Sequence, residues 1–464
     1  MRLELHPRQS AAFVSPATEI LYGGAAGGGK SHLMRTAAIA WATDIPGLQV
    51  YLFRRLSTDL VKNHMEGPTG FLSLLSEWVD AKLVRFNLSD NDIRFWNGSK
   101  IFLCHCQHEK DKYKYQGPEF HVLMIDELTH FSASIYSYLR GRVRLGGLRV
   151  PDRWRGRFPR IVAGSNPGGV GHNWVKAAFI DGCKPMEIRR MPVSEGGMLR
   201  QYIPAKLSDN PTLAETDPLY IDRLAGLGSP ELVRAMKDGD WDIVSGGMFD
   251  DVWRRDTHVI KPFKIPDGWV VDRAFDWGSS KPFSVLWFAE ADGVQHPAGR
   301  YWPRGTLVVV AEWYGWNGMP DTGLKLTNRE IARGIVEREA DMKLKALPGP
   351  ADSAIFSEYN GSSVAADMAA EGVVWVPADK RPGSRILGWE AIRQRLKAGM
   401  SEPMESPGLF VFDNCQQFIR TVPVLPRDEN KPDDVDTGSE DHVGDCLRYR
   451  CGIANNLTTG WDWS

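Results

Sequence analysis

The chain is poor in cysteine, lacks a long apolar run and carries almost no net charge. Its 6 cysteines are scattered over 464 residues, which favours a reducing compartment and excludes a disulfide framework. No apolar run is long enough to cross a membrane, and we expect no signal peptide at the N-terminus. With 56 basic and 58 acidic residues, the chain as a whole is not a polycation, so any nucleic-acid surface must be local.

The composition that remains is that of a folded globular protein. Hydrophobic residues make up 42% of the chain, with 17 Trp and 19 Phe. A chain of 464 residues exceeds what one hydrophobic core usually organises, so two domains are expected. We find no internal repeat and no low-complexity segment.

The most informative motif is a glycine-rich loop, residues 24–31, that follows the apolar run 20–22. It fits the phosphate-binding pattern G-x-x-x-x-G-K-[ST], whose backbone amides and helix N-terminus bind phosphate oxygens. Lys30 would neutralise the β- and γ-phosphates, and Ser31 would be a ligand of Mg²⁺. The alternative is a glycine-rich turn that happens to end in Lys-Ser. The predicted nucleotide-binding residues of the loop are Gly24, Ala25, Ala26, Gly27, Gly28, Gly29, Lys30 and Ser31.

Two later strands supply the remaining parts of a nucleotide site. The apolar run 122–125 is followed by Asp126, which would hold Mg²⁺ through water, and by Glu127, which would polarise the attacking water. An ordinary exit from a buried strand is the alternative. The run 160–164 is followed by Ser165 and Asn166, which could sense the γ-phosphate, although a simple strand-ending turn explains them equally well.

Two further segments leave alternatives open. The stretch 140–160 holds eight arginines against one acid, which favours phosphate contacts or, equally, a solvated arginine-rich loop. The cysteines and histidines in 104–108 raise the possibility of a zinc site, but the alternation over 100–106 predicts a half-buried strand.

The second half of the chain contains candidate nuclease carboxylates. A strand over 269–275 is predicted to end at Asp276, where an acid suits a metal-dependent nuclease of the RNase H-like kind. Asp352 is the second candidate, with Glu358 as its substitute. If residues 440–449 are helical, Asp441 and Asp445 lie one turn apart on one face. For each acid alone, a helix cap or a surface position is the alternative.

Together these motifs resemble those of the large terminase subunit of tailed double-stranded-DNA bacteriophages, along nearly the whole chain. The matching stretches are 6–9, 24–31, 126–127, 165–167, 202–211, 239–241, 247–249 and 441–449. The stretches between 202 and 249 are similar to the family's connector and have no chemistry of their own.

The resemblance assigns further roles. It implies that Gln9 contacts adenine and that an arginine approaches the γ-phosphate, with Arg140 and Arg142 as catalytic candidates beside Arg54 and Arg55. It implies ATP and Mg²⁺ in the first site. In the second, it implies two Mg²⁺ or Mn²⁺ ions held by the residues Asp276, Asp352 and Asp445, with Asp441 assisting.

The expected fold class is α/β with three parts. A P-loop ATPase domain with a parallel-rich sheet is predicted over 1–195, a small helical connector over 196–246, and an RNase H-like mixed α/β nuclease domain over 247–464.

The resemblance implies a viral DNA-packaging motor subunit, an ATPase and a two-metal-ion endonuclease. Its expected partners are double-stranded DNA, the portal protein and procapsid, the small terminase subunit and further copies in a ring, with no membrane. Its expected location is the cytoplasm of the infected bacterial host and, transiently, the procapsid portal. A cellular P-loop helicase or repair ATPase would leave the second-half aspartates unexplained, and a non-enzymatic scaffold would not need Lys30, Asp126 and Glu127.

Overall fold

The computed structural model describes residues 4–181, 183–225, 233, 237–241, 247–318, 322–358, 361–428 and 430–453. The chain divides into two compact units, residues 1–245 and 246–464. Each combines one β-sheet with α-helices, as expected for the α/β class. Among the described residues, no helix has both the length and the apolar character needed to span a membrane.

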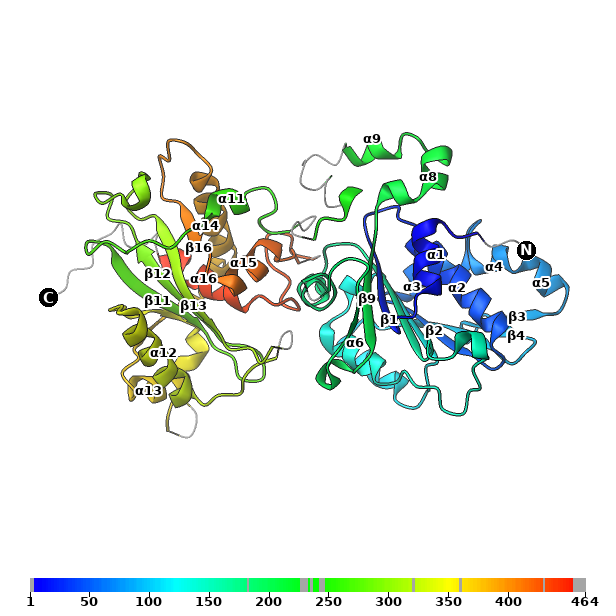
Figure 1. Ribbon diagram of the computed structural model, residues 1–464. Coiled ribbons are helices and arrows are strands. Elements are labelled where there is room, and N and C mark those ends of the chain that lie inside the picture. Colours follow the sequence, from blue (N-terminus) through cyan, green and yellow to red (C-terminus); the bar gives the residue numbers. More distant parts are fainter. Residues whose placement is uncertain are drawn as a thin grey trace. The chain divides into compact units, whose positions relative to one another are not determined.

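The first unit is built on a sheet whose described strands follow the order β3-β4-β5-β2-β6-β7-β1-β9-β8 (Figure 1). The neighbouring strands β5, β2, β6, β7, β1 and β9 run parallel to one another. The outer strands β3, β4 and β8 pair antiparallel. The strands are β1 (Glu19–Gly24), β2 (Gln49–Arg54), β3 (Val84–Asn87), β4 (Asp92–Phe95), β5 (Lys100–His105), β6 (Val122–Asp126), β7 (Arg160–Ser165), β8 (Ile188–Arg190) and β9 (Leu199–Ala205). The α-helices are α1 (Pro7–Val14), α2 (Lys30–Asp44), α3 (Ser57–Leu60), α4 (Phe71–Leu74), α5 (Ser76–Asp80), α6 (Ala133–Arg140), α7 (His172–Val175), α8 (Pro211–Thr216) and α9 (Tyr220–Ala225).

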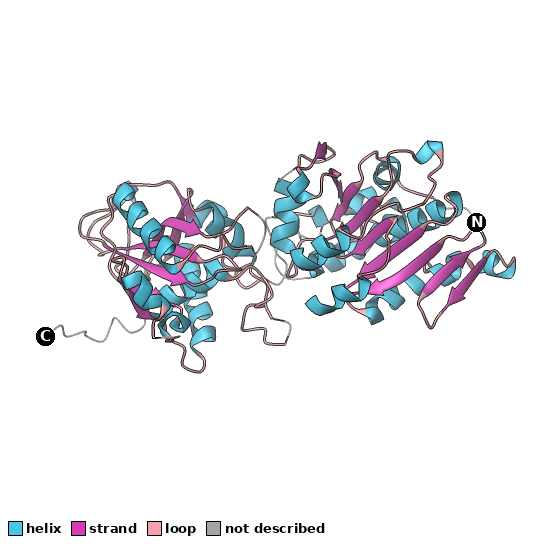
Figure 2. Cartoon of the chain, turned by 90° about the horizontal axis from the view of Figure 1, so that it is seen from below, coloured by secondary structure: helices cyan, strands magenta, loops and turns pink. Residues whose placement is uncertain are grey.

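Both faces of this sheet are covered by helices (Figure 2). Because successive side chains of a strand point to opposite faces, Val50 and Leu52 of β2 pack into a core with α2, whereas Tyr51 and Phe53 pack into a core with α6. Burial on both sides explains why the central strands are nearly continuous apolar runs.

The parallel strands bring three predicted segments to one edge. In the register, Gly23 of β1 lies beside Ser165 of β7, and Asp126 of β6 lies beside Gly164. The loops that follow β1, β6 and β7 therefore leave the sheet together at its carboxyl edge, where ligands of open α/β sheets bind.

The second unit has a sheet whose described strands follow the order β10-β16-β13-β12-β11-β14-β15. The strands β11, β12 and β13 are antiparallel neighbours, and β14 and β15 run parallel to β11. Taken in chain order from β11 to β15, the sheet has the arrangement 3-2-1-4-5, which is the RNase H-like topology expected from the sequence. The strands are β10 (Val259–Ile260), β11 (Val270–Asp276), β12 (Ser284–Glu290), β13 (Leu307–Tyr314), β14 (Gly349–Ala351), β15 (Trp375–Pro377) and β16 (Leu409–Phe412).

Helices lie on both faces of the second sheet, with α12 and α13 on one side and α14 and α16 on the other (Figure 1). Helix α16 packs directly on β11, so its residues face the end of the strand that carries Asp276. The helices are α11 (Arg255–His258), α12 (Asn328–Met342), α13 (Val364–Ala369), α14 (Ser384–Gly399), α15 (Gln416–Thr421) and α16 (His442–Ile453).

The structure differs from the expected partition at the helical connector. Residues 199–205 form β9, a strand of the first sheet between β1 and β8, and the short helices α8 and α9 follow it. The first unit extends to 245 and the second starts at 246, beside the expected boundary at 247. The division into functional domains stays a prediction.

Candidate active sites

The loop after β1 surrounds the first residue of α2. Gly29 precedes α2 with a φ of 76°, a backbone conformation that favours glycine, and a Cβ there would lie 2.4 Å from Nε2 of Gln9. Nζ of Lys30 donates to the carbonyl of Ala25 at 3.0 Å and to Oδ1 of Asn166 at 2.5 Å. Burial lowers the pKa of Lys30, against the effect of nearby carboxylates. Ser31 follows in the first turn of α2 and is half-buried.

Asp126 ends β6 with only 1% of its surface exposed. Its Oδ2 accepts hydrogen bonds from Nε2 of His64 at 3.0 Å and from Nη1 of Arg54 at 3.1 Å. Burial raises the pKa of Asp126, but the two basic neighbours outweigh it, so the pKa lies below its usual range. Its Oδ1 is buried with no hydrogen-bond partner in the described part of the chain. An anionic oxygen left without a partner fits a role toward Mg²⁺ or a water of its shell.

Glu127, directly after this strand, has φ 58° and ψ 64°. A non-glycine residue pays a conformational cost in this left-handed region, and such residues cluster at functional sites. Nδ2 of Asn166 lies 3.4 Å from Oε1 of Glu127. Asn166 therefore contacts Lys30 with one side-chain atom and Glu127 with the other.

Ser165 joins the ends of β6 and β7. Its Oγ accepts a hydrogen bond from the backbone N–H of Thr129 at 3.0 Å, and the two hydroxyls lie 2.9 Å apart. The Thr129 hydroxyl also donates to the carbonyl of Asn166 at 3.1 Å. The structure thus ties the segment after Glu127 to the predicted coupling segment.

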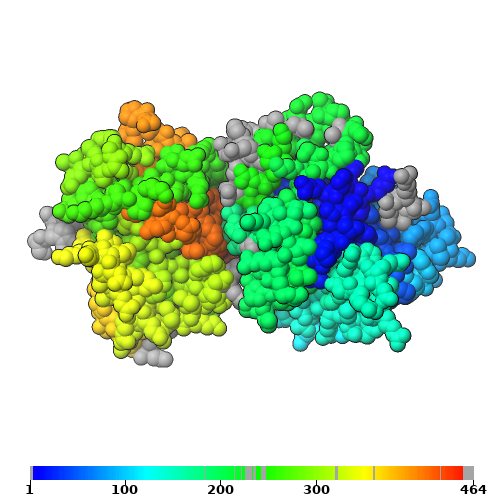
Figure 3. Space-filling view, in the orientation of Figure 1, coloured from blue at the N-terminus to red at the C-terminus, as the bar shows by residue number. Residues whose placement is uncertain are grey.

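The N-terminal segment lies against the loop and the segment after β9. Nε2 of Gln9 donates to the carbonyl of Gly29 at 2.9 Å, and only 2% of Gln9 is exposed. Figure 3 shows this segment in dark blue beside the green segment near residue 210, which it joins through a 2.9 Å contact between His6 and Thr212. Gln9, the predicted adenine contact, supports the loop backbone here.

The structure does not bring Arg140 or Arg142 to the loop of the same chain. Arg140 lies 3.6 Å from Glu19, the first residue of β1, whereas the loop follows the other end of that strand. Arg142 donates to the carbonyl of Gln116, and its own carbonyl accepts from the N–H of a residue just before β6. Both arginines therefore lie at the amino edge of the sheet, and of the four candidates only Arg54 contacts a predicted nucleotide-site carboxylate within the described chain.

The arginine-rich stretch 140–160 is largely used by the fold. Arg160 is fully buried and donates to the carbonyls of Ala12, Phe13 and Ser15 beneath the ring of Trp41. Other arginines of the stretch pair with acids, as Arg144 with Glu119, Arg153 with Asp44 and Arg155 with Asp152. The hypothesis of a continuous phosphate-binding stretch is therefore not supported by this arrangement.

The predicted nuclease carboxylates gather around the end of β11. Asp276 is 6% exposed, and its Oδ1 accepts from the Tyr449 hydroxyl at 3.2 Å. Its Oδ2 lies 3.2 Å from Nδ1 of His442. Burial, together with the charges of Asp445 and Asp352, raises the pKa of Asp276.

Asp441 and Asp445 share one arginine. The backbone N–H of Asp445 donates to the carbonyl of Asp441 at 2.8 Å, so the two acids are one turn apart. Nη1 of Arg385 lies 3.1 and 3.0 Å from the two oxygens of Asp445, and Nη2 lies 3.3 Å from Oδ2 of Asp441. Nε of Arg385 reaches Asp434 at 2.6 Å. Burial and the charge of Asp445 raise the pKa of Asp441 to about 7.

Asp352 follows β14, which forms despite Pro350 in its middle. Its backbone N–H donates to the carbonyl of Phe275 at 3.0 Å, which places it beside the end of β11. Its Oδ1 accepts from the N–H of Ala354 at 2.9 Å and pairs with Lys380. Glu358, the substitute candidate, is exposed.

The four aspartates offer hard oxygen ligands of the kind Mg²⁺ and Mn²⁺ take. Within the described residues, however, no three His, Cys, Asp or Glu side chains converge on one metal position. Basic side chains of the same unit, Arg385 and Lys380, contact these carboxylates instead. The donor chemistry fits divalent cations, and Arg385 and Lys380 offset part of the negative charge.

Three residues of these sites were not predicted from the sequence. His64 stands in no recognisable motif, and only the fold brings it to Asp126. Lys380 and Arg385 belong to a short basic stretch, 380–385, that also contains Arg381. That stretch was a usable signal, because basic side chains near an acidic cluster balance its charge.

The structure favours the strand over the zinc site at residues 104–108. Lys100–His105 is strand β5, as the alternation predicted. Cys104 and Cys106 are buried. Among the described residues, no three His, Cys, Asp or Glu side chains gather into a metal site, so the zinc alternative has no support there.

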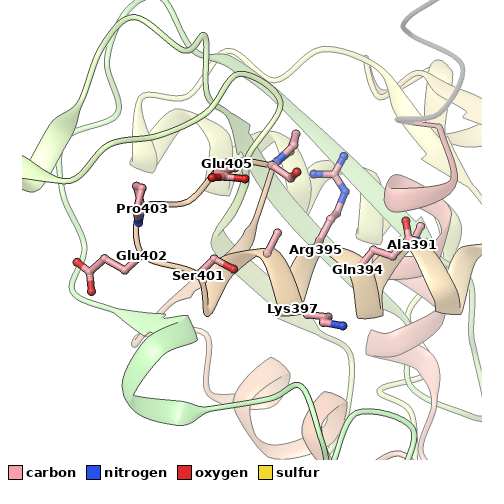
Figure 4. Close-up of a pocket in the computed structure, with 11 residues that line it drawn as sticks. Ala391, Gln394, Arg395, Lys397, Ser401, Glu402, Pro403 and Glu405 are labelled. Carbon is pink, nitrogen blue, oxygen red and sulfur yellow. The ribbon is translucent and has the colours of Figure 1, made fainter.

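A cavity of about 730 Å³ opens beside the C-terminal half of α14 (Figure 4). Arg395 and Gln394 of that helix line it, together with the segment from Ser401 to Pro407. None of the predicted nuclease residues lines this cavity.

Comparison with known proteins gives a family for part of the chain. Residues 21–151 match the family model of the terminase large subunit, T4likevirus-type, N-terminal, which confirms the resemblance over the phosphate-binding loop and the Asp126–Glu127 pair. No curated protein matches the chain.

Several solved structures are similar. The large terminase of a thermophilic bacteriophage, in complex with ADP, has 16% identity and a TM-score of 0.40, covering 98% of this chain and 100% of that one. The HK97 bacteriophage large terminase has 12% identity and a TM-score of 0.44, covering 98% and 95%. The P22 large terminase nuclease domain has 19% identity and a TM-score of 0.33, covering 46% and 95%. At these identities and TM-scores, the family assignment depends on the match over residues 21–151.

Proposed function

We propose that this chain, whose residues 21–151 match the family model of the terminase large subunit, T4likevirus-type, N-terminal, is the motor subunit that packages viral DNA. It would hydrolyse ATP to move double-stranded DNA into a procapsid and would cut concatemeric DNA with its second unit. The observation that carries the proposal is that Asn166 contacts both Lys30 and Glu127 at the edge of the first sheet where Asp126 ends β6.

In the ATPase site, each residue has a definite task. The loop amides and Lys30 would bind the phosphates of ATP, and Ser31 and Asp126 would hold Mg²⁺, which neutralises phosphate charge when bound. Glu127 would accept the proton of the attacking water. When ATP binds, Asn166 would release Lys30 to the phosphates and keep its contact with Glu127. Nucleotide binding would therefore change the contacts of the neighbouring residues Ser165 and Thr129.

In the nuclease site, Asp276, Asp352 and Asp445, with Asp441, would hold Mg²⁺ or Mn²⁺. These ions supply the charge that activates water and stabilises the leaving oxygen of a phosphodiester. The side chains of this unit position the acids. Tyr449 and His442 hold Asp276, and Lys380 holds Asp352.

The proposed partners and place of action follow from the motor role. DNA translocation requires repeated grip and release, so we propose a ring of these subunits on the portal of a procapsid, with a small terminase subunit delivering the DNA. The cytoplasm of the infected bacterial host is the proposed location, with transient residence at the portal.

ATPase assays on the full chain test the motor half. Wild type should hydrolyse ATP faster when double-stranded DNA is added, and E127A should reduce turnover by at least about a hundredfold, because the general base is lost. D276A, a carboxylate change in the other unit, is the control and should leave turnover unchanged. Wild-type hydrolysis that E127A does not reduce would contradict the assignment of Glu127.

Plasmid cleavage tests the other half. Wild type should nick and linearise plasmid DNA with Mn²⁺ or Mg²⁺, D276A should not, and E127A should cleave normally. Metal-dependent cleavage that survives in D276A would show that the nuclease site lies elsewhere.

A further inference from the structure

A buried histidine of the first unit holds the carboxylate of Asp126. His64 has no exposed surface and belongs to a short π-helix, Val61–Met65, that follows α3. Its Nε2 lies 3.0 Å from Oδ2 of Asp126. Single turns of π-helix are rare and occur frequently at functional sites.

The contact defines the direction of the hydrogen bond. A carboxylate oxygen only accepts, so Nε2 of His64 carries the proton and donates. The other ring nitrogen, Nδ1, is buried without a hydrogen-bond partner in the described chain. The histidine therefore has one polar contact within the described chain, and it is made to Asp126.

The two donors to Asp126 reach the same oxygen. Arg54 at 3.1 Å and His64 at 3.0 Å both contact Oδ2, which leaves Oδ1 buried and without a partner among the described residues. A carboxylate held by one oxygen presents the other in a fixed direction. Such outer-shell support commonly orients groups that act on a metal.

The helix that carries His64 is tied to the helix that follows the phosphate-binding loop. Nη1 of Arg35 in α2 donates to the carbonyl of Asn63 at 2.7 Å, and Nη2 donates to the Thr69 hydroxyl at 3.2 Å. Arg35 is 5% exposed. The position of His64 is thus linked to α2, whose first residues contact the nucleotide phosphates in the proposed function.

We propose that His64 is a positioning residue of the ATPase site. Its Nε2–H bond fixes the Asp126 carboxylate through Oδ2 and leaves Oδ1 to act toward Mg²⁺ when the nucleotide binds, and Arg35 keeps this arrangement in register with the loop. The inference rests on the proposed ATPase function and adds a residue that none of the sequence motifs contains.

The test compares two amides in place of the ring, using the full chain. The side-chain nitrogen of Gln reaches as far as Nε2 of His, whereas that of Asn reaches only as far as Nδ1. H64Q therefore keeps the donor to Asp126 and H64N does not. The readout is the affinity for a fluorescent ATP analogue, measured once with Mg²⁺ and once with EDTA. His121, a buried histidine at the amino end of β6 that accepts from the Gln49 N–H, supplies the control H121N.

The expected result is a selective loss. H64N should lower the affinity for the analogue about 10-fold or more with Mg²⁺, in the range seen for outer-shell partners. It should leave the affinity in EDTA unchanged. H64Q and H121N should stay within about threefold of wild type in both conditions.

Equal weakening by H64N in both conditions, or none in either, would overturn the inference, as would an H64Q variant that binds as H64N does. If H64N does not fold, H64Q alone decides, because normal Mg²⁺-dependent binding supports the inference and a lost Mg²⁺ effect contradicts it. A wild type whose affinity for the analogue is the same with Mg²⁺ and EDTA would instead contradict the proposed ATPase function.

Discussion

At the scale of single residues, two ATPase candidates, Lys30 and Glu127, contact one common side chain. Asn166 is the residue that links them, because it reaches Lys30 at 2.5 Å and Glu127 at 3.4 Å. The sequence predicted Asn166 from its place after a strand, but an ordinary turn explained it equally well. Only the register of β6 beside β7 shows why this position touches both Lys30 and Glu127.

We expect N166A to reduce ATP turnover by about tenfold or more, because Glu127 loses the side chain that orients it. Nucleotide affinity should change less, since the loop amides and Lys30 remain. Steady-state ATPase rates and equilibrium binding on the same preparation check this. Turnover within twofold of wild type would show that the Asn166 contacts are incidental.

In the second unit, Arg385 is the residue that links several acidic side chains. It contacts Asp434, Asp441 and Asp445 at once. Removing it leaves partly buried carboxylates facing each other, so R385Q should lower the free energy of unfolding by roughly 2 kcal/mol or more in EDTA. Denaturant unfolding and hydrogen exchange of peptides from α14 and α16 measure the loss.

The control for R385Q is R381Q, which removes an exposed arginine whose partner is Asp379. Exposed pairs of this kind contribute little to stability, so R381Q should change it much less than R385Q does. Equal stability of the two variants would mean that Arg385 does not balance the acidic cluster.

At the scale of helices and strands, the sequence predicted where strands lie along the chain better than it predicted which strands pair. Apolar runs located β1, β6 and β7, because strands buried on both faces are continuously apolar. Residues 199–205 were expected to belong to a helical connector, but they form β9. The sequence did not reveal this strand because β9 pairs with β1, about 180 residues away in the chain. Proline disfavours a strand, yet β14 forms with Pro350 in its middle.

The arginine-rich stretch 140–160 also shows that the sequence alone does not reveal which residues are buried. A count of basic residues cannot distinguish Arg160, which is fully buried against α1 and Trp41, from Arg155, whose side chain is 82% exposed. The candidate nuclease carboxylates were predictable as residue types at a strand end or one helical turn apart. Their counter-charges, Arg385 and Lys380, left a signal in the basic stretch 380–385, but only the fold shows which acids they contact.

We therefore expect R160A to destabilise the first unit by roughly 3 kcal/mol, since three backbone carbonyls lose a charged donor. R155A, at the exposed pair with Asp152, should change stability by less than about 0.5 kcal/mol. Thermal unfolding of the full chain compares the two. A stability loss in R155A as large as that in R160A would contradict the structural role assigned to Arg160.

At the scale of the whole molecule, the proposal gives separate chemistry to two units that have separate sheets and cores. All the candidate nuclease aspartates lie in the second unit, residues 246–464. We expect this unit, produced alone, to unfold cooperatively and to cleave plasmid DNA without ATP. Loss of cleavage in a folded preparation would show that the first unit supplies part of the nuclease site.

The central claim is that ATP hydrolysis at Lys30, Asp126 and Glu127 moves DNA into a capsid. DNA packaging into procapsids that carry the cognate portal, scored as DNA protected from added nuclease, tests it most directly. With linear DNA, wild type and D276A should both protect DNA when ATP is present, and E127A should protect none. Protection by E127A equal to that by wild type, or none by wild type while its DNA-stimulated ATPase is intact, would contradict the account.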